Sequence, residues 1–162
     1  DRMAKSESAS TVKVFYSYSH NDESYLDDLK KHLSILKRQR VIHEWDDRMI
    51  TAGTDWKKTI DERLNTAQII LFLISADFLA SDYCYGVEME RAMERHEAGE
   101  ARVIPVILRP VDNWQATPFG GLKACPKDGK PVSKWRDKDE AFADVARHEI
   151  SPVEDDGTNR SA

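Results

Sequence analysis

The sequence predicts an α/β fold with a parallel sheet and helices on both of its faces. Short, almost continuous apolar stretches alternate along the chain with longer stretches of helical periodicity, and this alternation is typical of strand–helix–strand units. The length of 162 residues favours one domain. We expect residues 1–10 to form a flexible leader and residues 151–162 a polar tail that could lead to a further domain.

The first third of the chain contains two expected strands and the helices that follow them. VKVFYS at 12–17 is β-branched and aromatic, as expected of a strand buried on both faces. One tyrosine and three leucines at helical spacing predict a single helix over 23–38. VIHEW at 41–45 is the second expected strand. The polar loop DDRMITAGTD then leads to a helix over 56–65, with Asp55 as its N-cap.

The middle of the chain contains the most apolar stretch, QIILFLIS at 68–75, which we place at the centre of the sheet. The next helix carries Glu88, and Gly99 is typical of the residue that follows a helix end. RVIPVIL at 102–108 is the fourth expected strand. Pro105 cannot donate to a strand ladder, so this strand should have an edge-like stretch.

The last expected elements are a short fifth strand at 131–133 and a helix over 137–150. In parallel sheets of this class, ligands bind at the carboxyl ends of the strands. Three of those ends carry the polar segments SYSHND, WDDRMITAG and SADFLASDY. The order of elements therefore predicts that these segments converge on one cleft.

Composition excludes several classes of function. The net charge of −5 and the pI near 5.6 argue against a nucleic-acid partner. No apolar run approaches the ~20 residues of a membrane helix, and no signal peptide is visible, so we expect a cytoplasmic protein. Cys84 and Cys125 form no metal-binding cluster and are expected to be free thiols. No glycine-rich dinucleotide or P-loop motif signals a bound cofactor.

Four stretches in order resemble the TIR domain family, and bacterial members in particular. They are VFYSYSHND, EWDDRMITAGTDWKKTIDERL, LFLISADFLASDYCYGVEMERAM and RVIPVILRPVDNW. The resemblance covers about residues 11–150. It implies a flavodoxin-like, doubly wound sheet of five parallel strands in the order 2-1-3-4-5.

The resemblance also implies an activity. Many TIR domains cleave NAD+ at the nicotinamide–ribose bond, by hydrolysis or cyclisation, so NAD+ would be a substrate and no cofactor is expected. The glutamate of catalytic members maps on Glu88. The family usually has an aromatic residue four positions earlier, but residue 84 is Cys, which leaves Tyr83 or Tyr85 for that role. Kinship with bacterial members further suggests a role in defence against phage, activated by self-association.

Helical periodicity also singles out Glu88. Tyr85 and Met89 belong to an apolar stripe whose border includes Glu88, while Glu90 and Glu94 point toward solvent. One carboxylate can suffice for NAD+ because nicotinamide leaves as a neutral molecule and needs no proton donor; the carboxylate stabilises the cationic ribosyl centre. The competing interpretation is a surface glutamate paired with Arg91.

Further candidate substrate-binding residues lie in the first two loops. Ser17, Tyr18 and His20 could contact the ribose or a phosphate, whereas Ser19 and Asp22 are typical turn and helix-capping residues. In the second loop, Asp46 matches an acidic position that lines the family cleft.

The remainder of the second loop is a candidate interface. The resemblance implies that this loop gates the site and contacts other domains, and Asp47, Arg48, Gly53 and Trp56 belong to this group. Gly53 also suits a backbone turn, and Trp56 could instead anchor the first helical turn in the core. The alternative function is therefore a non-catalytic module that binds other TIR domains. A flavin-binding domain is a third, weaker hypothesis.

Overall fold

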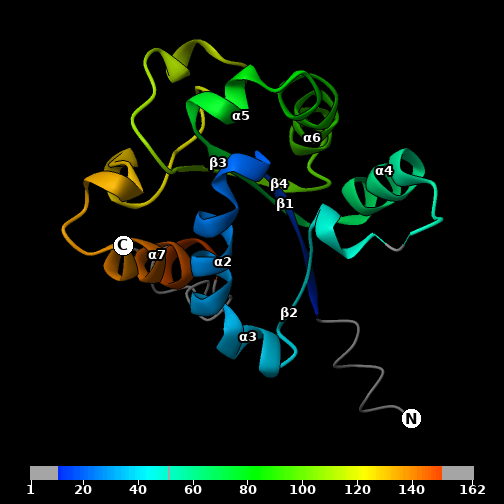
Figure 1. The fold of residues 1–162 in the computed structure, drawn as a ribbon, viewed down its shortest axis with the longest axis horizontal. Coiled ribbons are helices and arrows are strands. Elements are labelled where there is room, and N and C mark those ends of the chain that lie inside the picture. The colour runs from blue at the N-terminus through cyan, green and yellow to red at the C-terminus, as the bar shows by residue number, and fades with distance from the viewer. Residues whose placement is uncertain (1–10, 51, 151–162) are drawn as a thin grey trace.

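The computed structural model describes residues 11–50 and 52–150, and within them four parallel strands form one sheet (Figure 1). The strands are β1 (Val12–Ser17), β2 (Ile42–Trp45), β3 (Ile69–Ile74) and β4 (Arg102–Ile107). Their order is β2-β1-β3-β4, with β1 paired to both β2 and β3. This order confirms the predicted arrangement of the first four strands.

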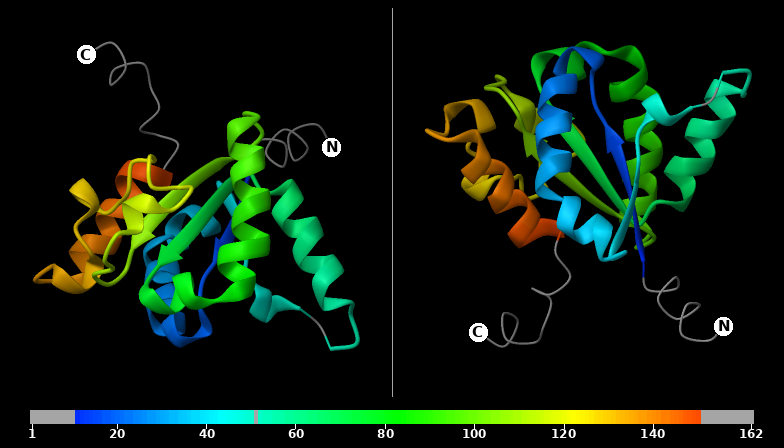
Figure 2. Two further views of the ribbon diagram at one scale, coloured as in Figure 1. Left: turned by 90° about the horizontal axis from the view of Figure 1, so that it is seen from above. Right: turned by 60° about the horizontal axis from the view of Figure 1, so that its bottom comes forward.

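Helices cover both faces of the sheet, as Figure 2 shows. One face carries α2 (Glu23–His32), α3 (Ser34–Arg38) and α7 (Lys138–Val145). The other carries α4 (Trp56–Thr66), α5 (Ala76–Ala80) and α6 (Met89–Glu97). Successive strand residues point to opposite faces, so the two helical layers enclose two separate apolar clusters. All six residues of β3 are buried, which confirms that this strand is central.

The single helix expected over 23–38 is divided in two at Leu33. The Leu33 N–H is shared between the carbonyls of Leu29, at 3.2 Å, and Lys30, at 3.1 Å, a bifurcated arrangement typical of helix ends. Leu33 is fully buried, and Leu36 in α3 packs against the same apolar cluster. The prediction of one helix was wrong because hydrophobic periodicity shows only which residues face the core. It does not show a break in the helix when the residues on both sides of that break still face the core.

The fifth strand expected at 131–133 is not formed in the described residues. A short 3₁₀ helix, Val132–Lys134, occupies this stretch. The edge of β4 is covered by a single bridge, in which Cys125 N–H donates to the Pro105 carbonyl and Ile107 N–H donates to the Cys125 carbonyl, both at 2.9 Å. Proline residues at 126 and 131 cannot donate to a ladder, which prevents a longer pairing. The edge-like character expected around Pro105 is confirmed.

The segment after β3 differs from the simple helix that was expected. Ser75 caps α5 by accepting a hydrogen bond from the Phe78 N–H at 3.1 Å, and a π-helical segment, Asp82–Glu88, then leads directly into α6. The end of α6 is as predicted, with Gly99 at a φ of 78°. The last predicted helix is present as α7 and a π-helical segment, Ala146–Ile150.

Candidate functional site

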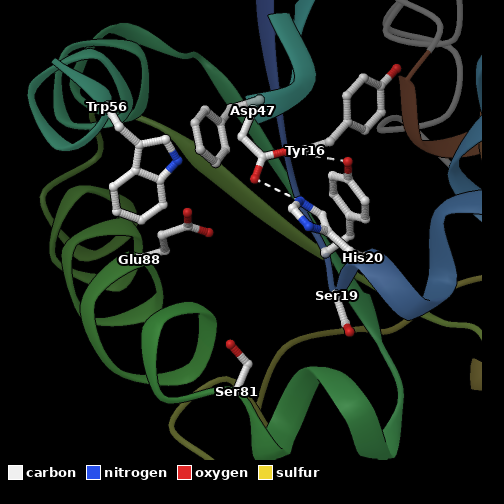
Figure 3. A pocket seen from close by; sticks show the side chains of 9 residues that line it. Tyr16, Ser19, His20, Asp47, Trp56, Ser81 and Glu88 are labelled. Carbon is white, nitrogen blue, oxygen red and sulfur yellow. Dashed lines mark hydrogen bonds and ion pairs between the residues drawn. The ribbon is translucent and has the colours of Figure 1, made fainter. Parts of the chain in front are cut away.

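A cavity of about 190 Å³ lies at the carboxyl end of β1, next to the loop after β2 and the π-helical segment that follows β3 (Figure 3). The three polar segments expected to converge each contribute side chains to it, so that prediction is confirmed. The lining residues are Phe15, Tyr16, Tyr18, Ser19, His20, Asp47, Trp56, Ser81 and Glu88.

Glu88 is the buried acid of this cavity. It is 5% exposed, and the Ser17 hydroxyl donates a hydrogen bond of 2.5 Å to its Oε1 atom. The pKa of Glu88 is raised to about 7, chiefly by burial; the Ser17 hydrogen bond and His20 oppose this rise, and the negative charge of Asp47 adds to it. The carboxyl group can therefore gain or lose a proton near neutral pH.

The neighbouring acids of α6 are solvent-exposed, as the periodicity predicted for Glu90 and Glu94. Arg91, which the surface interpretation would pair with Glu88, instead bonds to Asn65 at 2.5 Å and to Glu94 at 3.0 Å. The geometry therefore favours the interpretation of Glu88 as a site residue over that of a surface ion-pair partner.

Asp47 connects two other residues of the cavity. Its Oδ1 atom accepts a hydrogen bond from the Tyr18 hydroxyl at 3.2 Å, and its Oδ2 atom lies 2.9 Å from Nε2 of His20. Burial and the charge of Asp47 raise the pKa of Tyr18 well above its ordinary value. Sequence reasoning placed Asp47 in the candidate interface, but the structure brings it to the cavity wall with Tyr18 and His20.

Asp46 lies behind the cavity wall and does not line it. Its carboxylate is fully buried, bonded to Lys30 Nζ at 2.6 Å and to the Arg48 backbone N–H at 2.9 Å. Burial alone would raise the pKa of Asp46, but hydrogen bonds from Arg48 and Lys30 lower it below the ordinary value. Asp46 was expected to line the cleft and contact the substrate. In this structure it instead fixes the 3₁₀ turn Asp47–Met49 against α2.

The other predicted loop residues have three different environments. The Arg48 guanidinium bonds to Glu23 at 2.6 Å and lies 3.0 Å from Asp27, both on α2. Gly53 has a φ of 88°, which confirms its role in a backbone turn. Trp56 is 48% exposed and lines the cavity, so its alternative interpretation as a core anchor was wrong.

Ser17 and its neighbours have more specific partners than the sequence indicated. Ser17 bonds to Glu88 itself, and Ser19 caps the following turn by accepting from the Asn21 N–H at 3.3 Å. The Asp22 side chain makes no capping bond to α2, contrary to expectation. It is buried instead, accepting hydrogen bonds from Ser75 at 2.5 Å and from Arg109 at 2.6 Å.

Sequence reasoning missed the contribution of Ser81 to the cavity, and no periodic signal could have found it because it lies between two helices. The side chains of Tyr83 and Cys84 lie outside the described part of the chain. Tyr85 packs at the margin of the apolar cluster beneath α6. Which of these tyrosines faces a substrate stays a prediction.

Residues 11–50 and 52–150 contain neither a candidate metal site nor a helix that could cross a membrane. No group of three or more His, Cys, Asp or Glu side chains there could hold a metal ion. In the same ranges, every helix is too short or too polar to cross a membrane. Cys125 is buried, and its thiol donates a hydrogen bond of 3.4 Å to the Pro105 carbonyl.

Comparison with known proteins identifies relatives of this chain. The family model of the TIR domain matches residues 14–146. The uncharacterized protein y4lF of Sinorhizobium fredii is 60% identical over 134 residues, which is 83% of this chain. The chain spans only 41% of the length of that relative, whose origin agrees with the predicted bacterial type.

One solved structure supports the fold, and a second is reported for comparison. The TIR domains of the activated Roq1 resistosome, which directly recognises the pathogen effector XopQ, align over 91% of this chain and 93% of theirs, with a TM-score of 0.51 and 18% identity. The TIR domain of the Toll-related receptor TRR-2 from Hydra magnipapillata aligns over 61% of this chain and 72% of its own, with a TM-score of 0.46 and 18% identity. Because the family match extends from β1 to the end of α7, this chain belongs to the TIR domain family.

Proposed function

We propose that this domain cleaves NAD+ at the nicotinamide–ribose bond and that Glu88 is its catalytic carboxylate. The observation that carries the proposal is the placement of Glu88, a 5% exposed acid that lines a cavity at the carboxyl ends of parallel strands. Buried acids with a raised pKa are characteristic of catalytic sites.

The chemistry needs one negative charge at a fixed position. When the C1′–N bond breaks, its electron pair stays with nicotinamide, which leaves neutral, and positive charge develops on the ribosyl carbon. A carboxylate held near that carbon stabilises the transition state more than the ground state. The cation of the bound substrate also favours the charged form of Glu88, which offsets the effect of burial on its pKa.

The size of the cavity suits one end of a dinucleotide and not the whole molecule. A volume of about 190 Å³ is smaller than the roughly 300–1,000 Å³ of most small-molecule sites. We therefore place only the nicotinamide riboside end inside, with the remainder of NAD+ along the surface. Trp56 lines the cavity with a half-exposed indole, and we assign it a stacking role beside the nicotinamide ring.

The test is nicotinamide release from NAD+ by the purified, concentrated domain, followed by chromatography. We expect Glu88→Ala to lower the rate by at least about 100-fold. Glu90→Ala is the matched control, because it removes an exposed acid two residues away and should leave the rate unchanged. Equal rates for Glu88→Ala and the wild-type domain would sink the assignment of Glu88.

A second candidate function is a non-catalytic module that binds other TIR domains. Three large apolar side chains are exposed on the segments that contribute residues to the cavity: Met49, Trp56 and Val87. Such residues are typical of the core of a protein interface. Assembly of a wild-type domain that never releases nicotinamide, even at high concentration, would favour this function over the enzymatic one.

A further inference from the structure

His20 and Asp47 form a second polar pair in the cavity that contains Glu88. Both side chains line it, and Figure 3 shows them on the wall formed by the segment after β1 and the loop after β2, with Glu88 on the π-helical segment. The Nε2 atom of His20 lies 2.9 Å from Oδ2 of Asp47, and the His20 side chain is 68% exposed. The pair is thus fixed at one end and accessible to solvent at the other.

The hydrogen bonds of Asp47 determine which nitrogen of His20 is available. Both Asp47 oxygens have partners, because the Tyr18 hydroxyl donates to Oδ1 and His20 occupies Oδ2. A carboxylate only accepts hydrogen bonds, so Nε2 of His20 must carry its proton. In that tautomer Nδ1 keeps a lone pair. The Tyr18 ring, with its centroid 5.4 Å from that of His20, also limits the orientation of the imidazole.

We propose that His20 is the general base that activates water for hydrolysis of the ribosyl centre, with Asp47 as its positioning residue. The inference rests on the proposed cleavage of NAD+ and adds a residue to its second step. Water attacks C1′ as the C1′–N bond breaks or after it has broken. The new bond is C1′–O, the electron pair of the old bond leaves with nicotinamide, and the proton of the water passes to Nδ1 of His20.

Glu88 is poorly suited to this second role. Its Oε1 atom is engaged by the Ser17 hydroxyl at 2.5 Å, and its charge is needed beside the ribosyl cation during bond cleavage. A carboxylate that stabilises a nearby cation is a weaker base. An imidazole held by a carboxylate has the tautomer and orientation required to accept a proton from water.

Base exchange provides a test that separates the two steps. A neutral pyridine base can attack C1′ without losing a proton, so it needs the same bond cleavage but no general base. The domain is incubated with NAD+ and 3-acetylpyridine, and chromatography measures ADP-ribose and the exchanged dinucleotide. We expect His20→Gln to lower the ratio of hydrolysis to exchange by about 10- to 100-fold. Asp47→Asn should shift the ratio in the same direction, without an additive effect in the double variant.

His32→Gln is the matched control. His32 lies 3.0 Å from Asp139 in a similar pair, but this pair joins α2 to α7 and does not line the cavity, so the ratio should not change. Equal losses of hydrolysis and exchange in His20→Gln would overturn the assignment and indicate a binding or structural role. A wild-type domain that forms neither product would overturn the proposed function together with this inference.

Discussion

Glu88 is buried, and burial makes its protonation depend on folding because it raises the pKa more than the Ser17 hydrogen bond lowers it. Its pKa is about 7 in the folded chain and 4.5 as an ordinary glutamate. Between those two values the folded state holds a proton that the unfolded state has lost. The free energy of unfolding therefore falls as the pH rises through this window. The stabilisation associated with the neutral carboxyl is complete below the lower value and is lost above the upper one.

Replacement of Glu88 by Gln should remove this pH dependence. The amide oxygen can still accept from the Ser17 hydroxyl, but the side chain never becomes a buried charge. We expect Glu88→Gln to be more stable than the wild-type domain by up to roughly 3 kcal/mol at about pH 8, with a difference below about 1 kcal/mol near pH 5. Urea denaturation at both pH values measures the two differences. A constant difference between them would contradict the raised pKa of Glu88.

The 3₁₀ turn Asp47–Met49 is the element that brings Asp47 to the cavity, and Asp46 holds this turn in place. The Asp46 carboxylate binds Lys30 of α2 and both the backbone and the side chain of Arg48. Removal of one partner from a buried charge network leaves the others uncompensated. The turn should therefore depend on Asp46 although this residue does not line the cavity.

We expect Asp46→Asn to lower the free energy of unfolding by roughly 2–4 kcal/mol, as measured by urea denaturation. Asp28→Asn, on α2, is the control, because Asp28 forms a solvent-exposed pair with Lys31 at 3.8 Å. That change should cost less than about 0.5 kcal/mol. If the two variants were equally stable, the buried network would not hold the turn.

The strands and most helices were predictable because burial leaves a regular pattern of apolar residues in their sequences. β3 is apolar throughout, Asp55 caps α4 with a hydrogen bond to the Lys58 N–H at 3.1 Å, and Gly99 follows α6. The break at Leu33 and the short 3₁₀ helix Val132–Lys134, which lies where a fifth strand was expected, were not predictable. Both depend on where individual backbone groups find partners, and hydrophobic periodicity does not report these.

The candidate site was predictable to the level of its segments and only partly to the level of its residues. Glu88 was found because the apolar stripe that runs from Tyr85 into α6 has a helical period that separates core from solvent, and Glu88 lies at its border. Asp46 and Asp47 are chemically identical neighbours, yet one is buried behind the wall and the other faces the cavity. A loop has no period, so only the contacts of Asp46 with Lys30 and Arg48 could distinguish the two.

At the scale of the whole molecule, the loop that contributes Asp47 to the cavity also carries the exposed side chains of Arg48 and Met49. Arg48 would be a poor probe of an interface there, because its guanidinium already bonds to Asp46 and Glu23, with Asp27 close by. Reversal of its charge would disturb the loop itself. Met49 follows Arg48 in the turn, is 44% exposed and does not line the cavity, so it can be changed with less effect on the site.

If the domain assembles through this loop, Met49→Glu should weaken its self-association by at least about tenfold, because a charge would enter an apolar contact. Analytical ultracentrifugation over a concentration series measures this effect. Nicotinamide release should fall at low concentration and recover at high concentration, since the cavity residues are unchanged. Ile35→Glu, on α3 and 65% exposed, is the control and should leave assembly unaltered. Equal effects of the two variants would indicate general aggregation and would exclude this loop as the specific interface.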